Sequence, residues 1–387
     1  MGRHSKKRRV MRHNPAFKKS LVWGILIAAA VPGVLSTAVL YDHVRQSWDG
    51  LAADTAVLSA MYTVPDRAFE QLRERFAQPS DPQQPEQEQE KAQQPLIPPQ
   101  RQEEQPPPTK TQPPPEPVEI PEEYRGTVVE EDLAAAGSSL CFGSGRIKNA
   151  TSLSEQQVEE YLAQPQPFLL DRQGPQVLIM HTHATESFEP YDSEIYDTRH
   201  TWRSTDNSEN IVAAGEVMAQ AIRSHGIEVL HDDTQHDYPS YNGSYERSAE
   251  TVKEYLAKYP SIKVVLDVHR DAVQRDSTLV KPVTQINGKK AAQMMIIAGC
   301  DDGTMEMPNW GKNLRFAAGI QDAIESRWQG LTRPIFFCYR KYNLDLTTGS
   351  LLLELGSHGN TLEQVLTTAQ LAGDAIGNYL AQECMAE

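Results

Sequence analysis

The sequence predicts an α/β domain whose mostly parallel, twisted sheet carries helices on both faces, preceded by one transmembrane helix and a disordered linker. Strand-like and helix-like patterns alternate from residue 177 onward, as they do in strand–helix–strand units. The strand-like runs, such as 177–180 and 294–299, are apolar throughout, which is typical of strands buried on both faces. An uncharged run near the N-terminus and a tract rich in Pro, Gln and Glu predict the other two parts.

The N-terminus has the pattern of a membrane anchor. Residues 1–19 form a basic tail without any acidic residue, and residues 20–41 carry no charge at all. A spanning helix needs about 20 apolar residues, and Trp23 and Tyr41 suit the two membrane interfaces. A cleaved signal peptide is the alternative, because small residues occur at 34–38. Since positive charge stays inside, we expect the tail in the cytoplasm and everything after Tyr41 outside it.

The next segments are expected to connect the anchor to a folded domain. Residues 42–77 predict a juxtamembrane helical region, and residues 78–121 a disordered linker that has too few apolar residues to fold. In a polyproline II conformation of about 3.1 Å per residue, that linker would span on the order of 130 Å. Residues 122–174 lead into the domain and include a short helix over 154–162 with Ser152 as its N-cap.

The catalytic domain is expected over residues 175–387. The hydrophobic patterns predict strands at 177–180, 227–230, 264–268, 294–299, 335–338 and 351–355, the fifth of these at an edge of the sheet. They predict helices at 210–224, 248–259, 310–327 and 361–381. Gly226 is a suitable residue to end the first of these helices.

Composition and missing motifs exclude several functions. The net charge of −15 argues against a nucleic-acid partner, because binding phosphates needs clustered Lys and Arg. The four cysteines lack the spacing of a zinc knuckle, and although Cys300 and Cys338 could pair, we expect buried free thiols. The chain contains no GxSxG, no P-loop and no GxGxxG after a strand. Hydrolysis assisted by a metal ion is the chemistry that the residues support.

Metal-binding and acid/base side chains follow or end three of the predicted strands. His181, His183 and Glu186 come after the strand at 177–180, His269 ends the strand at 264–268, and Glu354 lies within the strand at 351–355. The carboxyl ends of parallel strands meet at one edge of a sheet. Two His and one carboxylate are a common ligand set of hydrolytic zinc, with a separate Glu as general acid/base. We therefore expect a Zn²⁺ ion there, held by three of these side chains.

Some roles have alternatives. An extended segment would put His181 and His183 on the same face, so that one binds the metal and the other supports the site. Glu209, at the start of the next helix, is the main rival of Glu186 as carboxylate ligand. Glu354 is unlike its apolar neighbours, and burying a carboxylate there is costly without a partner. The remaining candidates for contacts with substrate or ligands are His231, Arg270, Asn343 and Asp345.

Several blocks of the sequence resemble the stage II sporulation protein P family. They include VLIMHTHATESF, KVVLDVHRDA, MPNWGKNLRFA and RKYNLDLTTGSLLLELGSHGNTLEQV, in that order. The family is related in fold to the zinc-dependent N-acetylmuramoyl-L-alanine amidases. The resemblance implies that His183 and His269 bind zinc and that Glu354 is the general acid/base. Typical amidases would take the carboxylate from Glu209, whereas the HxxE pattern of zinc carboxypeptidases favours Glu186, which we choose.

The resemblance also implies a substrate and partners. The substrate would be peptidoglycan, cut between muramic acid and the stem peptide and also within cross-links, during septal wall remodelling and engulfment. The implied partners are the lytic transglycosylase stage II sporulation protein D and the membrane protein stage II sporulation protein M. The protein would sit in the membrane at the forespore septum, with its catalytic domain outside the cytoplasm. The alternatives are a metallocarboxypeptidase of stem peptides and a non-catalytic scaffold that binds the wall.

Overall fold

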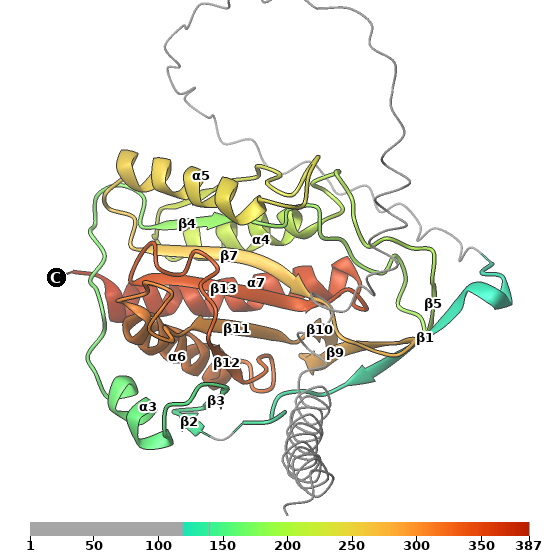
Figure 1. Cartoon of the computed structure of the whole chain (residues 1–387), viewed down its shortest axis with the longest axis horizontal. Helices are drawn as coiled ribbons and strands as arrows, with labels where there is room; N and C mark the ends of the chain where they lie inside the picture. The colour runs from blue at the N-terminus through green and yellow to red at the C-terminus, as the bar shows by residue number, and fades with distance from the viewer. Residues whose placement is uncertain (1–118, 139, 387) are drawn as a thin grey trace, which may run out of the picture. The chain divides into compact units, whose positions relative to one another are not determined.

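The computed structural model describes residues 119–138 and 140–386 (Figure 1). The tail at 1–19, the span at 20–41, the helical region at 42–77 and nearly all of the linker at 78–121 lie outside the described residues. Within the described part of the chain, every helix is too short or too polar to cross a membrane.

The larger sheet has eight strands in the order β2-β3-β12-β11-β13-β7-β4-β6. Neighbouring strands pair in parallel, except in the β2–β3 and β11–β13 pairs. The strands are β2 Leu140–Phe142, β3 Gly145–Asn149, β4 Val177–Met180, β6 Val229–His231, β7 Val264–Asp271, β11 Met294–Gly299, β12 Ile335–Cys338 and β13 Gly349–Ser357. The prediction that 335–338 is an edge strand was wrong, because β3 pairs with its outer side.

Helices cover both faces of this sheet, as Figure 1 shows. Alternate residues of β4 explain the two layers: Val177 and Ile179 pack with Met218 of α4, whereas Leu178 and Met180 pack with Val252 of α5. The first face also carries α6 and α7, and α3 packs against α6. The helices are α3 Glu155–Leu162, α4 Ile211–Arg223, α5 Ser244–Lys258, α6 Trp310–Arg327 and α7 Leu362–Tyr379, with a π-helical turn at Leu380–Cys384.

Two helices begin at residues other than those predicted. Ser154, and not Ser152, caps α3 through a capping box with Gln157, while the Ser152 hydroxyl bonds to the phenol of Tyr339. Helix α5 starts at Ser244, four residues earlier than expected, behind the left-handed Gly243 (φ 81°). This extra turn brings the first residues of α5 to the end of β4.

A second, smaller sheet was not predicted. Its strands are β1 Arg125–Glu131, β5 Ile195–Asp197, β8 Gln274–Arg275, β9 Thr278–Ile286 and β10 Lys289–Ala292, in the order β10-β9-β1-β5 with β8 beside β9. Residues 122–174 thus supply strands to both sheets, and a 3-10 turn at Glu122–Tyr124 precedes them. Strand β5 ties the loop between β4 and α4 to this sheet, which matters for the site below.

Candidate metal site

Three buried side chains converge at the carboxyl ends of β4 and β7. They are His183 and Glu186, from the loop after β4, and His269 of β7, and one ligand atom of each lies within 4.8 Å of the others. Glu186 lies between the imidazoles: Oε1 is 3.7 Å from His183 Nδ1, and Oε2 is 3.6 Å from His269 Nδ1. The two rings are nearly perpendicular, with centroids 5.0 Å apart. The structure therefore brings together the three residues that the sequence analysis chose as zinc ligands.

Local backbone structure creates this convergence. The chain turns directly after β4, where the amide of Glu186 donates to the carbonyl of His183 at 3.2 Å. This turn places both side chains on the same side. Strand β7 runs three residues further than predicted, so that Arg270 and Asp271 follow His269 at its carboxyl end.

Polar contacts at the other ring nitrogens orient the two histidines, an ion pair for His269 and a hydrogen bond for His183. His269 Nε2 is 2.8 Å from Asp267 Oδ1, and Asp267 accepts hydrogen bonds from the amide and hydroxyl of Thr182 at 2.8 and 2.7 Å. His183 Nε2 is 3.2 Å from the hydroxyl of Ser244. Both Nδ1 atoms are thereby left to face Glu186. Histidines that bind metals usually have the second nitrogen fixed in this way.

The ionisation of His183 and Glu186 suits a cation. Burial lowers the pKa of His183 to about 4, so that the ring is neutral near pH 7. Its Nδ1 is buried and has no hydrogen-bond partner in the part of the chain that the structure describes. Burial raises the pKa of Glu186, but Arg270, His269 and Arg203 lower it more and keep it below its usual range. Burial lowers the pKa of His269, but the carboxylates of Asp267 and Glu186 outweigh it and hold that pKa well above its usual value, so this ring must release a proton when it binds a metal ion. Two imidazoles and an ionised carboxylate are a donor set that zinc takes. The residues present therefore fit a zinc ion.

Glu209 occupies a different place. It is exposed just before α4 and accepts a hydrogen bond from the hydroxyl of Ser204 at 3.4 Å. By contrast, Glu186 accepts a hydrogen bond from the backbone amide of Arg270 at 3.0 Å, and this bond fixes the carboxylate of Glu186 in the site. Of the two carboxylates that the sequence left open, Glu186 is the one beside the histidines.

Glu354 lies in β13, directly opposite His269 in the parallel β13–β7 pair. Its side chain is buried, and Oε2 has no hydrogen-bond partner within the described residues. Burial raises the pKa of Glu354 to about 8, with Asp271 and Glu186 adding to the effect and His269 opposing it. A carboxyl with such a pKa exchanges protons near neutral pH, as a general acid/base does.

His181 and His231 form a separate pair. His181 Nε2 is 2.9 Å from His231 Nε2, and His231 Nδ1 is 3.0 Å from Glu216 of α4. His181 thus faces α4, whereas His183 faces Ser244 of α5. The expectation that both histidines share a face was wrong, because the chain is no longer extended after Met180. Burial lowers the pKa of His181 to about 3.

The remaining predicted residues lie around the site. The guanidinium of Arg270 is buried and donates to the carbonyls of Ser187 and Trp202 at 2.9 and 3.1 Å, so it braces the loop after β4. Asn343 donates to the carbonyl of Tyr245 at 2.8 Å and to the hydroxyl of Ser248 at 3.1 Å. Asp345 forms an ion pair with Lys341 at 3.3 Å.

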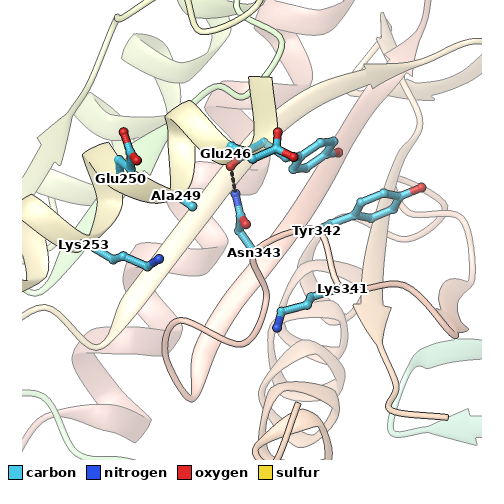
Figure 2. Close-up of a pocket in the computed structure, with 8 residues that line it drawn as sticks. Glu246, Ala249, Glu250, Lys253, Lys341, Tyr342 and Asn343 are labelled. Carbon is cyan, nitrogen blue, oxygen red and sulfur yellow. Dashed lines mark hydrogen bonds between the residues drawn. The ribbon is translucent and has the colours of Figure 1, made fainter. Parts of the chain in front are cut away.

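A groove of about 420 Å³ adjoins the site, between α5 and the segment at 341–343 (Figure 2). Tyr245 belongs to both, because its ring meets the edge of His183 at 5.4 Å and stacks on Tyr342 at 5.2 Å. The walls carry charges of both signs. The lining residues are Tyr245, Glu246, Ala249, Glu250, Lys253, Lys341, Tyr342 and Asn343.

Sequence reasoning missed two residues at the rim of the site. Tyr241 stacks on His183 with centroids 4.6 Å apart, and Arg203 lies 3.8 Å from Glu186. Both belong to loops rich in aromatic and polar residues, and nothing in the local pattern singles out these two positions.

Comparisons with known proteins agree on a family. The family described as Stage II sporulation protein P (SpoIIP) matches residues 57–377. Stage II sporulation protein P of Bacillus subtilis (strain 168) is 28% identical over 244 residues, which cover 59% of this chain and 57% of the relative. The match thus spans little more than half of that relative's length.

Similar solved structures include two amidases. One is the N-acetylmuramyl-L-alanine amidase Ami1 of Mycobacterium abscessus, with 14% identity and a TM-score of 0.31 over 53% of this chain and 98% of the other. The second is the CwlD amidase of Clostridioides difficile in complex with the GerS lipoprotein. It has 13% identity and a TM-score of 0.32 over 53% of this chain and 95% of the other.

Proposed function

The chain belongs to the stage II sporulation protein P family, and we propose that it is a zinc-dependent peptidoglycan hydrolase. The bond cut is the amide between N-acetylmuramic acid and L-alanine, with stem-peptide cross-links as additional substrates. The observation that carries the proposal is the buried cluster of His183, Glu186 and His269 with Glu354 on the adjacent strand.

The ligands would be His183, Glu186 and His269, held in place by Ser244, the Arg270 amide and Asp267 respectively. Zinc bound there would acidify a water molecule and polarise the carbonyl of the scissile amide. The ordered environment of each ligand means that little reorganisation accompanies the reaction.

Glu354 supplies the proton transfers. It takes a proton from the attacking water as the new C–O bond forms, and it then gives that proton to the amide nitrogen as the C–N bond breaks. The products are a lactyl carboxylate on the glycan and a stem peptide with a free amino terminus. A pKa raised toward 8 by burial makes the ionised form of Glu354 a stronger base for the first step than an exposed glutamate.

The cellular setting is also a proposal. A helix at 20–41 would anchor the protein, and the linker at 78–121 would let the domain reach into the wall at the forespore septum. On the family resemblance alone, sporulation proteins D and M would be partners.

Mass spectrometry of purified peptidoglycan would test the function. Sacculi are incubated with the full-length chain in zinc, in chelator, and with the Glu354→Gln variant. Free stem peptides that form only with zinc and wild-type Glu354 support the amidase. Trimmed peptides still linked to muramic acid would instead indicate a metallocarboxypeptidase, which the HxxE placement of Glu186 favours as second candidate. An unchanged wall that co-sediments with the protein would indicate a scaffold.

A further inference from the structure

Arg203 brings a positive charge to the candidate metal site from a loop that contributes none of the three proposed ligands. It lies in the loop between β5 and α4, and its Nη2 is 3.8 Å from Glu186 Oε1. The same carboxylate oxygen is 3.7 Å from His183 Nδ1. The guanidinium therefore stands next to the atoms that face the centre of the site.

Hydrogen bonds from Nη1, the nitrogen farther from Glu186, fix the position of this guanidinium. Arg203 Nη1 donates to Asp237 Oδ2 at 2.9 Å and to the hydroxyl of Thr185 at 3.3 Å. The Asp237 side chain is fully buried, and it also accepts the Thr185 hydroxyl at 2.6 Å. On either side of Arg203 the backbone bonds to the loop after β4, through Ser204 to Thr185 and through Ser187 to Trp202. One edge of the guanidinium is thus held by a buried carboxylate.

The backbone just before Arg203 is strained. Trp202 has φ 48°, in the left-handed region that side chains other than glycine rarely adopt. Its carbonyl accepts hydrogen bonds from the Ser187 amide and from Arg270, and its indole donates to Glu189 at 2.6 Å. Such strain persists only where the surroundings hold it, and it is commonest at functional sites. Here it turns Arg203 back toward Glu186.

Nη2 has hydrogen-bonding capacity to spare. Its 3.8 Å approach to Glu186 is too long for a hydrogen bond, and it makes no other within the described residues. The Arg203 side chain is 36% exposed, so a substrate can approach it beside the ring of Tyr241, whose centroid lies 5.4 Å from Cζ. Of the other cations nearby, Arg270 is committed to loop carbonyls, and Arg333 is closed off from solvent and paired with Asp271. Nη2 of Arg203 is thus an oriented donor without a hydrogen-bond acceptor among the described residues.

We propose that Arg203 is a catalytic residue that donates a hydrogen bond from Nη2 to the carbonyl oxygen of the scissile amide. The proposal rests on the amide hydrolysis described above. As water attacks, the π electron pair of the carbonyl moves onto its oxygen, and the water proton passes to Glu354. Arg203 stays protonated and stabilises the new negative charge. When the electron pair on the oxygen re-forms the C=O double bond and the C–N bond breaks, Glu354 gives its proton to the leaving nitrogen.

A preorganised donor of this kind acts on the transition state more than on bound substrate. Its loss should therefore lower kcat, by about 100- to 1000-fold, with little change in KM. An arginine that bound a carboxylate elsewhere on the stem peptide would instead raise KM and leave kcat unchanged.

The test compares Arg203→Ala and Arg203→Lys with Arg199→Ala in the full-length, zinc-loaded chain. Arg199 is the matched control, because it lies in the same loop but is exposed and paired with Asp197. The kinetics use a soluble muramyl peptide, with and without added guanidinium ion. Binding of a phosphinate analogue of the amide, zinc affinity and urea unfolding are measured in parallel.

We expect Arg203→Ala to lose kcat and phosphinate affinity by similar factors while zinc affinity and stability stay within a few-fold of wild type. Guanidinium should restore part of kcat to Arg203→Ala and nothing to Arg199→Ala. The proposal is overturned if Arg203→Ala matches Arg199→Ala, if only KM changes, or if zinc or stability is lost in proportion to activity. A wild-type chain that releases no peptide would overturn the hydrolase itself, and this proposal with it.

Discussion

Replacing Glu354 by Gln should change how the stability of the zinc-free protein depends on pH. Burial, reinforced by Asp271 and Glu186, raises the pKa of Glu354 from its usual 4.5 to about 8. Between these values the folded chain keeps the proton that the unfolded chain has released. The contribution of Glu354 is therefore complete below about pH 4.5, and it is lost as the pH rises toward 8. The glutamine side chain of the variant does not titrate, so this slope should disappear.

The size of the effect follows from the pKa shift. Each unit of difference in pKa is worth about 1.4 kcal/mol. From pH 5 to pH 7, the free energy of unfolding of wild type should fall by about 2 to 3 kcal/mol relative to Glu354→Gln. Urea unfolding in chelator at pH 5, 6, 7 and 8, followed by near-UV circular dichroism, measures the difference. Added zinc should flatten the wild-type slope, because a nearby cation favours the ionised carboxylate.

Two features make this comparison decisive. Titrating groups that do not interact with Glu354, such as Glu189, whose pKa burial raises to about 7, are present in both proteins and cancel in the difference. Glu209→Gln removes an exposed carboxylate and should leave the wild-type slope intact. If the curves of wild type and Glu354→Gln run parallel, Glu354 is ionised in the folded chain, and the acid/base role derived from its burial loses its basis.

Three further predictions concern the surroundings of the site. His183→Ala should abolish stoichiometric zinc binding in calorimetry, since its unpartnered Nδ1 is a proposed ligand; retained binding would remove it from the set. Asp267→Asn should weaken zinc affinity about 10- to 100-fold, because it orients the ring of His269; unchanged affinity would contradict that role. Gly215→Ala should destabilise the fold by about 1 to 3 kcal/mol in urea, as its Cβ would lie 2.4 Å from His181 Nε2 and 2.7 Å from His231 Nε2. Wild-type stability would mean that this histidine pair moves aside easily.

The central fold could be predicted because its strands have strong local patterns. Strands β4, β11 and β12 and helix α6 have the predicted bounds, since each is a continuous apolar or amphipathic segment. The small sheet depends instead on pairing between distant segments, such as Thr127 of β1 with Thr278 of β9. A local signal did exist for its β9–β10 hairpin. Asn287 and Gly288 both have positive φ, as in the turn that Asn-Gly favours between two strands.

In the candidate site, too, some residues could be predicted from local sequence patterns and others could not. Strand ends brought His183, Glu186 and His269 into consideration, because the carboxyl ends of parallel strands meet at one edge of a sheet. A charge within an apolar strand singled out Glu354. The position of Arg203 follows from the left-handed backbone at Trp202 and from a buried carboxylate contributed by another loop. These are tertiary features, and no spacing in the sequence encodes them.

The structure also indicates why metal binding and stability should be linked in this chain. Glu354 Oε2 and His183 Nδ1 are buried without hydrogen-bond partners among the described residues, and each such group costs folding free energy. Burial of the surrounding strands offsets that free energy, since β7 and β13 are buried along their whole length. A cation between His183 and Glu186 would give His183 Nδ1 a partner, and its charge would favour ionisation of Glu354. If zinc binds only the folded chain, the free energy of unfolding rises with the logarithm of the ratio of the free zinc concentration to its Kd. The gain should therefore be largest near pH 8, where the ionisable carboxyl of Glu354 disfavours the zinc-free fold most.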